Sequence, residues 1–261
     1  MADQTIKFND GAAYERGMGA WSRLAGEVFL DWLAPSNGLK WIDVGCGNGA
    51  FTELIVQQCD PTIVEGIDPS EAQIAFARER PAAGTANFRQ GDAEALPFIE
   101  KSFDVATMAL VIFFGPEPKK GIREMVRVVR PGGTVAAYAW DLPRGGFPFE
   151  AIWDEMHILG VTPKQPPSAD ISKMEAMLKL WTDAGLEAVE TKEIVVQRTF
   201  KDFDEFWSIS TSGSIGAQIS RVPASDVSVL KERVRARLPL DATGRITFSA
   251  RANAAKGRVS L

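Results

Sequence analysis

A turn with three glycines in five residues, Gly45 to Gly49, separates an apolar run containing Asp43 from a helix-like segment that begins at Ala50. Glycines let the backbone turn sharply and let a ligand lie against the main chain, because they carry no Cβ. The spacing is G-x-G-x-G. The dinucleotide fingerprint is G-x-G-x-x-G, and its helix N-terminus holds a pyrophosphate. The order of strand, turn and helix therefore predicts a nucleotide-binding corner without that tight phosphate site.

Two more carboxylates follow apolar runs further along the chain. Asp68 ends the run at 62–67, where a carboxylate can accept hydrogen bonds from both hydroxyls of a ribose. Asp92 follows the run at 86–90, where it can accept from an exocyclic amine such as that of adenine. Each has a plainer interpretation. Asp68 followed by Pro69 and Ser70 is a good helix start, and Asp92 after Gly91 is a good turn residue.

These carboxylates need a common edge, and the pattern of elements supplies one. The sequence predicts a helix at about 20–33, then alternating strands and helices up to residue 140, with a tight turn at 131–133. Alternation of this kind is typical of an open α/β sheet, whose ligands bind at the carboxyl ends of its strands. Asp43, Asp68 and Asp92 are therefore expected close together.

With these motifs in this order, the chain resembles the class I S-adenosylmethionine-dependent methyltransferases, in particular the small-molecule group of the methyltransferase type 11 kind. The resemblance rests on five segments spread over roughly residues 40 to 140: the glycine motif at 43–49, the ribose motif at 66–70, the adenine motif at 90–98, the fourth strand at 102–110 and the helix and turn at 123–134.

The resemblance implies S-adenosylmethionine as cofactor, with S-adenosylhomocysteine as product. The cofactor-binding residues carried over from the family pattern are Tyr14, Arg16, Asp43, Gly45, Cys46, Gly47, Asp68, Pro69, Asp92, Ala93, Met108 and Ala109. In that pattern Asp43 lies beside the amino group of the cofactor, although it could equally hold the loop by hydrogen bonds. The segment with Tyr14 and Arg16 would close over the methionine end, or be an ordinary solvated terminus. The side chain of Cys46 would simply fill the loop.

The family fold is a Rossmann-like α/β sheet of seven strands in the order 3-2-1-4-5-7-6, with strand 7 antiparallel and helices on both faces. Residues 1–140 would form the N-terminal helix and the cofactor-binding half, and 172–198 with 242–261 the rest of the core. The irregular segments 141–171 and 199–241 would form a small helical cap at the carboxyl edge. Ser172, with Glu175 three residues on, predicts a capping box at the start of a helix that ends at Ala184-Gly185.

Methyl transfer explains why a catalytic residue is hard to find in the sequence. The methyl group is already a good electrophile, so bringing an acceptor into line supplies much of the rate, and a base is needed only when the acceptor must lose a proton. His157, the sole histidine, is the candidate base, or else a surface residue. Asp141 and Glu155 are weaker alternatives. Aromatic residues that could line the acceptor site, or belong to the core, are Phe113, Phe114, Trp140, Phe147 and Trp153.

Composition limits the partners. A formal net charge of −5, with no cluster of basic residues, argues against nucleic acid. No signal peptide is visible, and the longest apolar run, 105–114, is too short to cross a bilayer. Two cysteines without a disulfide framework favour the cytoplasm. No metal site is expected.

We therefore predict methylation of carbon or oxygen in a small organic acceptor. The alternatives are a nicotinamide-dependent oxidoreductase and a non-catalytic protein that binds the cofactor as a sensor or scaffold.

Overall fold

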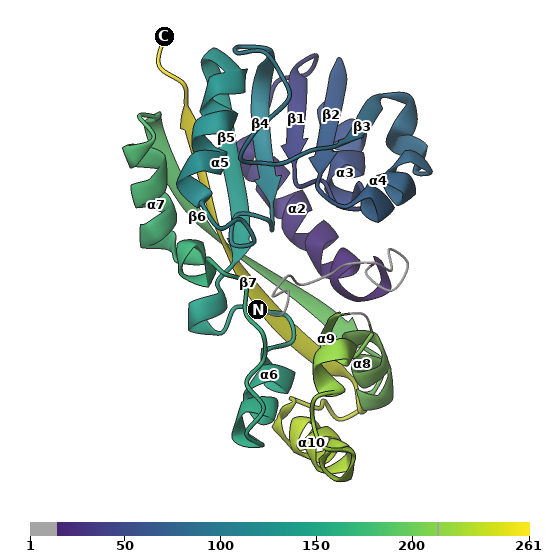
Figure 1. Cartoon of the computed structure of the whole chain (residues 1–261). Helices are drawn as coiled ribbons and strands as arrows, with labels where there is room; N and C mark the ends of the chain where they lie inside the picture. Colours follow the sequence, from purple (N-terminus) through teal and green to yellow (C-terminus); the bar gives the residue numbers. More distant parts are fainter. Residues whose placement is uncertain (1–14, 213) are drawn as a thin grey trace.

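The computed structural model describes residues 15–212 and 214–261, and its centre is one twisted sheet (Figure 1). The sheet has the order β3-β2-β1-β4-β5-β7-β6, as predicted. The first five strands of this order are parallel, and β7 is antiparallel to both its neighbours. The strands are β1 (Lys40–Val44), β2 (Ile63–Asp68), β3 (Ala86–Gln90), β4 (Phe103–Ala109), β5 (Val129–Trp140), β6 (Glu187–Phe200) and β7 (Ile246–Arg258).

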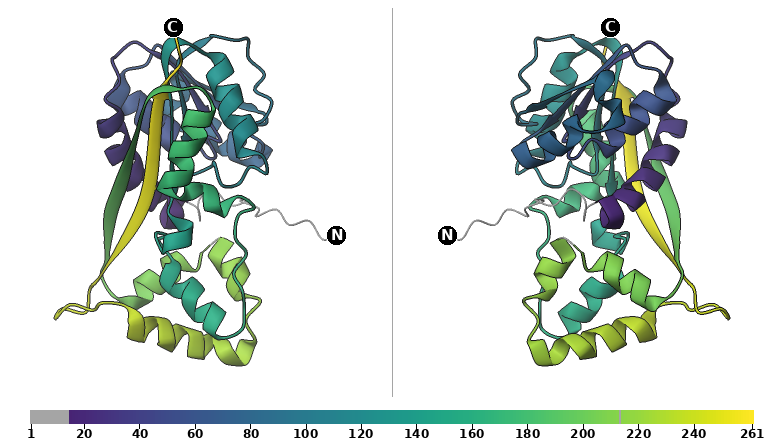
Figure 2. Two further views of the ribbon diagram at one scale, coloured as in Figure 1. Left: turned by 90° about the vertical axis from the view of Figure 1, so that its left-hand side faces the viewer. Right: turned by 90° about the vertical axis from the view of Figure 1, so that its right-hand side faces the viewer.

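Helices cover both faces of the sheet, because its central strands are apolar on both sides. On one face lie α2 (Ala20–Leu33), α3 (Ala50–Cys59) and α4 (Glu71–Arg78). On the other lie α5 (Pro118–Val128) and α7 (Met174–Asp183) (Figures 1 and 2). One turn of π-helix, Glu15–Gly19, leads into α2. Short 3₁₀ turns occupy Pro81–Gly84, Leu142–Arg144 and Ala169–Ser172.

The remaining helices form a second layer beyond the carboxyl ends of the parallel strands (Figure 1). They are α6 (Glu150–Ile158), which follows β5, and α8 (Phe203–Ser210), α9 (Ser214–Ile219) and α10 (Ala224–Arg237), which lie between β6 and β7. The strands β6 and β7 form a long antiparallel hairpin that carries α8 to α10 at its far end. Buried Glu155 of α6 binds Arg233 and Arg237 of α10, which ties the two cap segments together.

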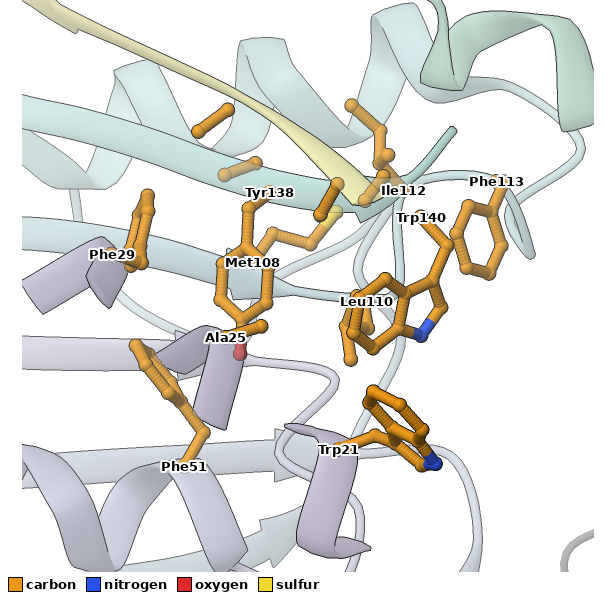
Figure 3. Close-up of a cluster of buried hydrophobic side chains, with 14 of the residues drawn as sticks. Trp21, Ala25, Phe29, Phe51, Met108, Leu110, Ile112, Phe113, Tyr138 and Trp140 are labelled. Atoms are coloured by element: carbon orange, nitrogen blue, oxygen red, sulfur yellow. The ribbon is translucent and has the colours of Figure 1, made fainter. Parts of the chain in front are cut away.

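An aromatic cluster joins α2 to the middle of the sheet (Figure 3). Phe29 of α2 and Phe51 of α3 pack on Tyr138 of β5, with ring centroids 4.7 and 5.7 Å away. The Tyr138 hydroxyl donates a hydrogen bond to the backbone oxygen of Ser22. This packing fixes α2 against the strand whose end borders the site.

The predicted capping box at Ser172 is wrong. The residue flanking α7 is Lys173, and the Ser172 hydroxyl donates to the Ala169 oxygen and accepts from the Leu142 N–H. Ser172 is fully buried, so its hydroxyl serves the loop after β5 instead of the helix. The helix does end as expected, with Gly185 at φ +77°. Within the described residues, no helix is long and apolar enough to cross a membrane.

Candidate functional site

The glycine turn is held against the end of β2. The N–H groups of Gly45 and Cys46 both donate to the backbone oxygen of Ile67, at 2.7 and 2.9 Å. The Gly47 N–H donates to Oδ2 of Asp68 at 3.0 Å. Gly45, Gly47 and Gly49 all have positive φ, which side chains with a Cβ rarely adopt. The turn that follows β1 and the carboxylate that ends β2 therefore form one unit.

Asp68 is not the cap of the following helix. Ser70 caps α4 through its hydroxyl, which accepts from the Gln73 N–H, while Oδ1 of Asp68 accepts from the Ser70 N–H at 2.9 Å. Burial raises the pKa of Asp68, and the two backbone hydrogen bonds oppose that rise. Each carboxylate oxygen has accepted one hydrogen bond and can accept another. The interpretation of Asp68 as a helix cap is therefore wrong. Its carboxylate lies at the end of β2 and can still accept hydrogen bonds from a ligand.

Asp43 is completely buried near the carboxyl end of β1. Its Oδ2 accepts from the Thr52 hydroxyl of α3 at 2.6 Å, and its Oδ1 has no hydrogen-bond partner in the part of the chain that the structure describes. Burial raises the pKa of Asp43 to about 7, against the Thr52 hydrogen bond and with a small contribution from Asp68. Asp43 therefore has a structural role, because its hydrogen bond to Thr52 ties β1 to α3. It also keeps one acceptor atom, Oδ1, without a hydrogen bond from the described residues. Such an atom suits a cationic or N–H donor.

The three glycines of the turn differ in how much space surrounds them. A Cβ added at Gly45 would come within 2.5 Å of the Val111 side chain, and one at Gly49 would lie 3.1 Å from Ala77. A Cβ at Gly47 would meet nothing within 4 Å. Of the three turn glycines, Gly47 is therefore the one with open space beside its backbone, and its N–H is bound to Asp68.

The end of β3 joins the same edge. Gly91 donates its N–H to the backbone oxygen of Asp68, and Asp92 follows with an exposed carboxylate. Oδ1 of Asp92 accepts from the Glu94 N–H at 2.8 Å, which closes a local turn. The turn interpretation of Asp92 is therefore observed, and it leaves Oδ2 available to a ligand. Of the neighbouring predicted contacts, Pro69 is exposed and Ala93 is half-buried.

The fourth strand completes the edge. Met108 is buried and Ala109 is half-buried at the end of β4, and the next N–H, from Leu110, donates to the Tyr138 oxygen. Cys46 is buried, with its Sγ 3.0 Å from the position of a Cβ at Gly66. Burial raises the pKa of the Cys46 thiol well above its usual value. The thiol is therefore neutral and fills the turn.

At the N-terminal segment, Tyr14 lies outside the described residues, as does the side chain of Arg16. Their predicted roles stay predictions. Between them, Glu15 accepts hydrogen bonds from Arg80 and from Nδ2 of Asn48, the latter at 2.9 Å. Sequence reasoning missed this cluster of Glu15, Asn48 and Arg80, which we call the clasp. No spacing rule links the three, because Arg80 follows α4, far along the chain from the other two.

Of the three predicted catalytic candidates, Asp141 lies at the carboxyl end of β5, whereas Glu155 and His157 lie on α6. The His157 side chain is exposed near the end of α6, a helix of the cap layer in Figure 1. Glu155 is committed to Arg233 and Arg237. Asp141 is buried after β5 and pairs with Arg251 at 3.3 Å. The role of His157 as a base therefore stays a prediction, and the structure gives it no additional support.

Aromatic side chains stand beyond the ends of β4 and β5 (Figure 3). Leu110, Phe113 and Trp140 are drawn on the same side of the cluster as Trp21 of α2. All four are buried, as are Phe147 and Trp153, which pack with ring centroids 4.3 Å apart. Phe114 is partly buried. The surroundings of the strand ends on this side are apolar.

Comparison with known proteins agrees with this geometry. A family model described as "Methyltransferase domain" matches residues 42–137, which include the turn, Asp68 and Asp92. A ubiquinone/menaquinone biosynthesis C-methyltransferase of Roseobacter denitrificans is 28% identical over 194 residues, covering 66% of this chain and 76% of that protein. A chloroplastic 2-methyl-6-phytyl-1,4-hydroquinone methyltransferase of Oryza sativa subsp. japonica is 42% identical over 99 residues, covering 38% of this chain and 28% of the rice protein.

This chain therefore spans less than a third of the length of the rice protein. Among solved structures, phosphoethanolamine N-methyltransferase 2 of Haemonchus contortus, in complex with S-adenosyl-L-methionine, superposes with a TM-score of 0.57. The match covers 90% of this chain and 52% of that one at 17% identity, a level that speaks for the fold alone.

Proposed function

This chain belongs to the class I S-adenosylmethionine-dependent methyltransferases, and we propose that it transfers a methyl group from S-adenosylmethionine to a small organic acceptor. The observation that carries the proposal is the shared edge of β1, β2 and β3. There Asp68 is hydrogen-bonded to the Gly47 N–H, and Asp43 lies one strand away.

The residues at this edge fit the cofactor. Asp68 would bind the ribose hydroxyls with its remaining acceptor capacity, and Asp92 would accept from the adenine amine. The unpartnered Oδ1 of Asp43 suits an ammonium group, because a buried acceptor without a partner is costly. Open space at Gly47 gives the ligand access to the main chain. When bound, S-adenosylmethionine supplies a methyl group on a sulfonium that a nucleophile can displace in line.

For the acceptor, we propose an aromatic ring methylated on carbon or oxygen. Support comes from the apolar side chains beyond β4 and β5, which suit an aromatic ligand, and from the printed names of the Roseobacter and rice relatives. The residues of this chain would orient the ring and exclude water, with the cap layer above them. Whether a side chain such as His157 accepts a proton depends on the acceptor.

Thermal unfolding with S-adenosylhomocysteine, S-adenosylmethionine or NAD added separately tests the cofactor. At a hundredfold excess over its Kd, a ligand stabilises by about 2.7 kcal/mol, a rise of roughly 5–10 °C for a chain of this size. We expect the rise with the two adenosyl sulfur compounds. A rise with NAD alone would favour an oxidoreductase. Binding without turnover across a panel of phenols and hydroquinones would favour a sensor or scaffold.

A further inference from the structure

Arg80 lies just after α4, and its guanidinium group contacts three different segments. Nε donates to the backbone oxygen of Asn48 at 2.6 Å, inside the glycine turn. Nη1 donates to Glu53 of α3 at 2.8 Å, and Nη2 donates to Glu15. The aliphatic stem of Arg80 packs near Gly49, where an added Cβ would lie 3.3 Å from Cδ. A single side chain thus links the turn, the helix that follows it and the start of the described N-terminal segment.

The guanidinium of Arg80 is largely buried, and its two carboxylate partners differ in exposure. The side chains of Arg80 and Glu53 are 11% and 12% exposed, whereas that of Glu15 is 44% exposed. Asn48 is buried and adds a second bond to Glu15 through Nδ2, while its Oδ1 accepts from the Ala50 N–H. At this low exposure the Arg80–Glu53 pair is stronger than a surface pair, and the Asn48 amide supports the more exposed Glu15. Without the guanidinium, the carboxylates of Glu15 and Glu53 and the backbone oxygen of Asn48 would each lose a hydrogen-bond donor.

We propose that Arg80 is a positioning residue that holds the single helical turn Glu15–Gly19 against the glycine turn and thereby slows release of the cofactor. This role rests on the proposed function, because it takes the turn as the cofactor site. The bond to the Asn48 oxygen fixes the peptide between Asn48 and Gly49, one residue beyond Gly47, the glycine that faces open space. The bond to Glu15 secures the single turn of π-helix, Glu15–Gly19, that leads into α2.

The test compares the rate at which S-adenosylhomocysteine dissociates from the wild-type chain and from Arg80→Met, Arg80→Lys and Glu15→Gln, measured by stopped-flow displacement. Arg130→Met is the matched control. Arg130 pairs with Asp104 at 2.5 Å at the opposite, amino edge of the sheet. Limited trypsin digestion, read by mass spectrometry as cleavage after Arg16, follows the N-terminal segment in the absence of ligand.

For Arg80→Met we expect dissociation at least tenfold faster, which corresponds to about 1.4 kcal/mol, together with faster cleavage after Arg16. Arg80→Lys should be intermediate, because an ammonium keeps the charge but not the three-way fork. Glu15→Gln should accelerate release about threefold or more, and it tests the role even if Arg80→Met fails to fold. Arg130→Met should match the wild type.

Two results would overturn the inference in different ways. Wild-type rates in folded Arg80→Lys and Glu15→Gln, in a chain that binds S-adenosylhomocysteine, would remove the role of Arg80 and leave the proposed function intact. A wild-type chain that does not bind S-adenosylhomocysteine at all would overturn the proposed function and this role with it.

Discussion

The carboxylate of Asp68 and the N–H of Gly47 are 3.0 Å apart, so the side chain that ends β2 also orders the turn that follows β1. This bond makes the two cofactor motifs interdependent. A substitution at either residue should therefore alter the position of the other.

Replacing Asp68 with Ala or Asn should weaken S-adenosylhomocysteine binding by about a hundredfold or more, because charge-assisted hydrogen bonds contribute roughly 1.5–3 kcal/mol each. Calorimetric titration measures the Kd, and circular dichroism checks the fold. Asp183→Asn, an exposed carboxylate on α7, is the control. An unchanged Kd in folded Asp68→Ala would remove the ribose role.

Asp43 should make the unfolding free energy depend on pH. Because burial raises its pKa from 3.8 to about 7, the folded chain holds this proton more tightly than the unfolded chain. The resulting stability is fully present below about pH 4 and is lost as pH rises through about 7, by up to about 4 kcal/mol. Asp43→Asn should remove this loss.

Urea unfolding at pH 5 and pH 8 measures the part of this loss that falls between those two pH values, about 3 kcal/mol. Glu150, whose pKa burial also raises to about 7, contributes equally to wild type and variant and cancels in the comparison. Equal pH dependence in the two proteins would show that Asp43 is ionised to the same extent in the folded and unfolded chains.

Two alanine substitutions in the glycine turn should separate binding from stability. Gly47→Ala places a methyl group in open space, at a strain cost of roughly 1–2 kcal/mol for its φ of +53°. It should lose S-adenosylhomocysteine affinity out of proportion to its small drop in Tm. Gly45→Ala adds a clash with Val111 at 2.5 Å and should lower Tm much more. Equal effects of both on Tm would contradict the space assigned to Gly47.

Arg233→Met should loosen the cap and leave the cofactor site intact. It removes the 2.6 Å partner of buried Glu155, at a cost of about 1–3 kcal/mol. Hydrogen exchange should rise in α6 and α10, with an unchanged Kd for S-adenosylhomocysteine. The double variant Glu155→Met/Arg233→Met should recover much of the protection, since no buried charge is left unpaired. A weaker Kd would show that the cap and the cofactor edge are coupled.

His157→Gln tests the predicted base. Because the side chain is exposed, we expect turnover within about threefold of wild type once an acceptor is known. A loss of two or three orders of magnitude in kcat, with S-adenosylhomocysteine binding unchanged, would instead assign the proton transfer to His157.

The cofactor edge could be predicted because it depends on local patterns, whereas the order of the sheet is expected from the resemblance to the class I methyltransferases. Asp43, Asp68 and Asp92 each follow or lie in an apolar strand, and parallel strands bring their carboxyl ends together. The clasp could not be predicted, because Glu15 and Arg80 meet only through tertiary packing. Ser172 misled for a related reason. Its spacing to Glu175 matches a capping box, but burial against the loop after β5 uses its hydroxyl elsewhere.

The hairpin that carries α8 to α10 has a consequence for how such a protein can change. Phe200 and Ile246 are paired across β6 and β7, so the chain leaves the sheet and returns to it at adjacent points. Residues 201–245 are therefore a module with neighbouring ends, and lengthening, shortening or exchanging it does not require cutting the sheet. If the proposed acceptor site lies beneath this module, acceptor preference would be free to diverge there while the nucleotide half keeps its own sequence.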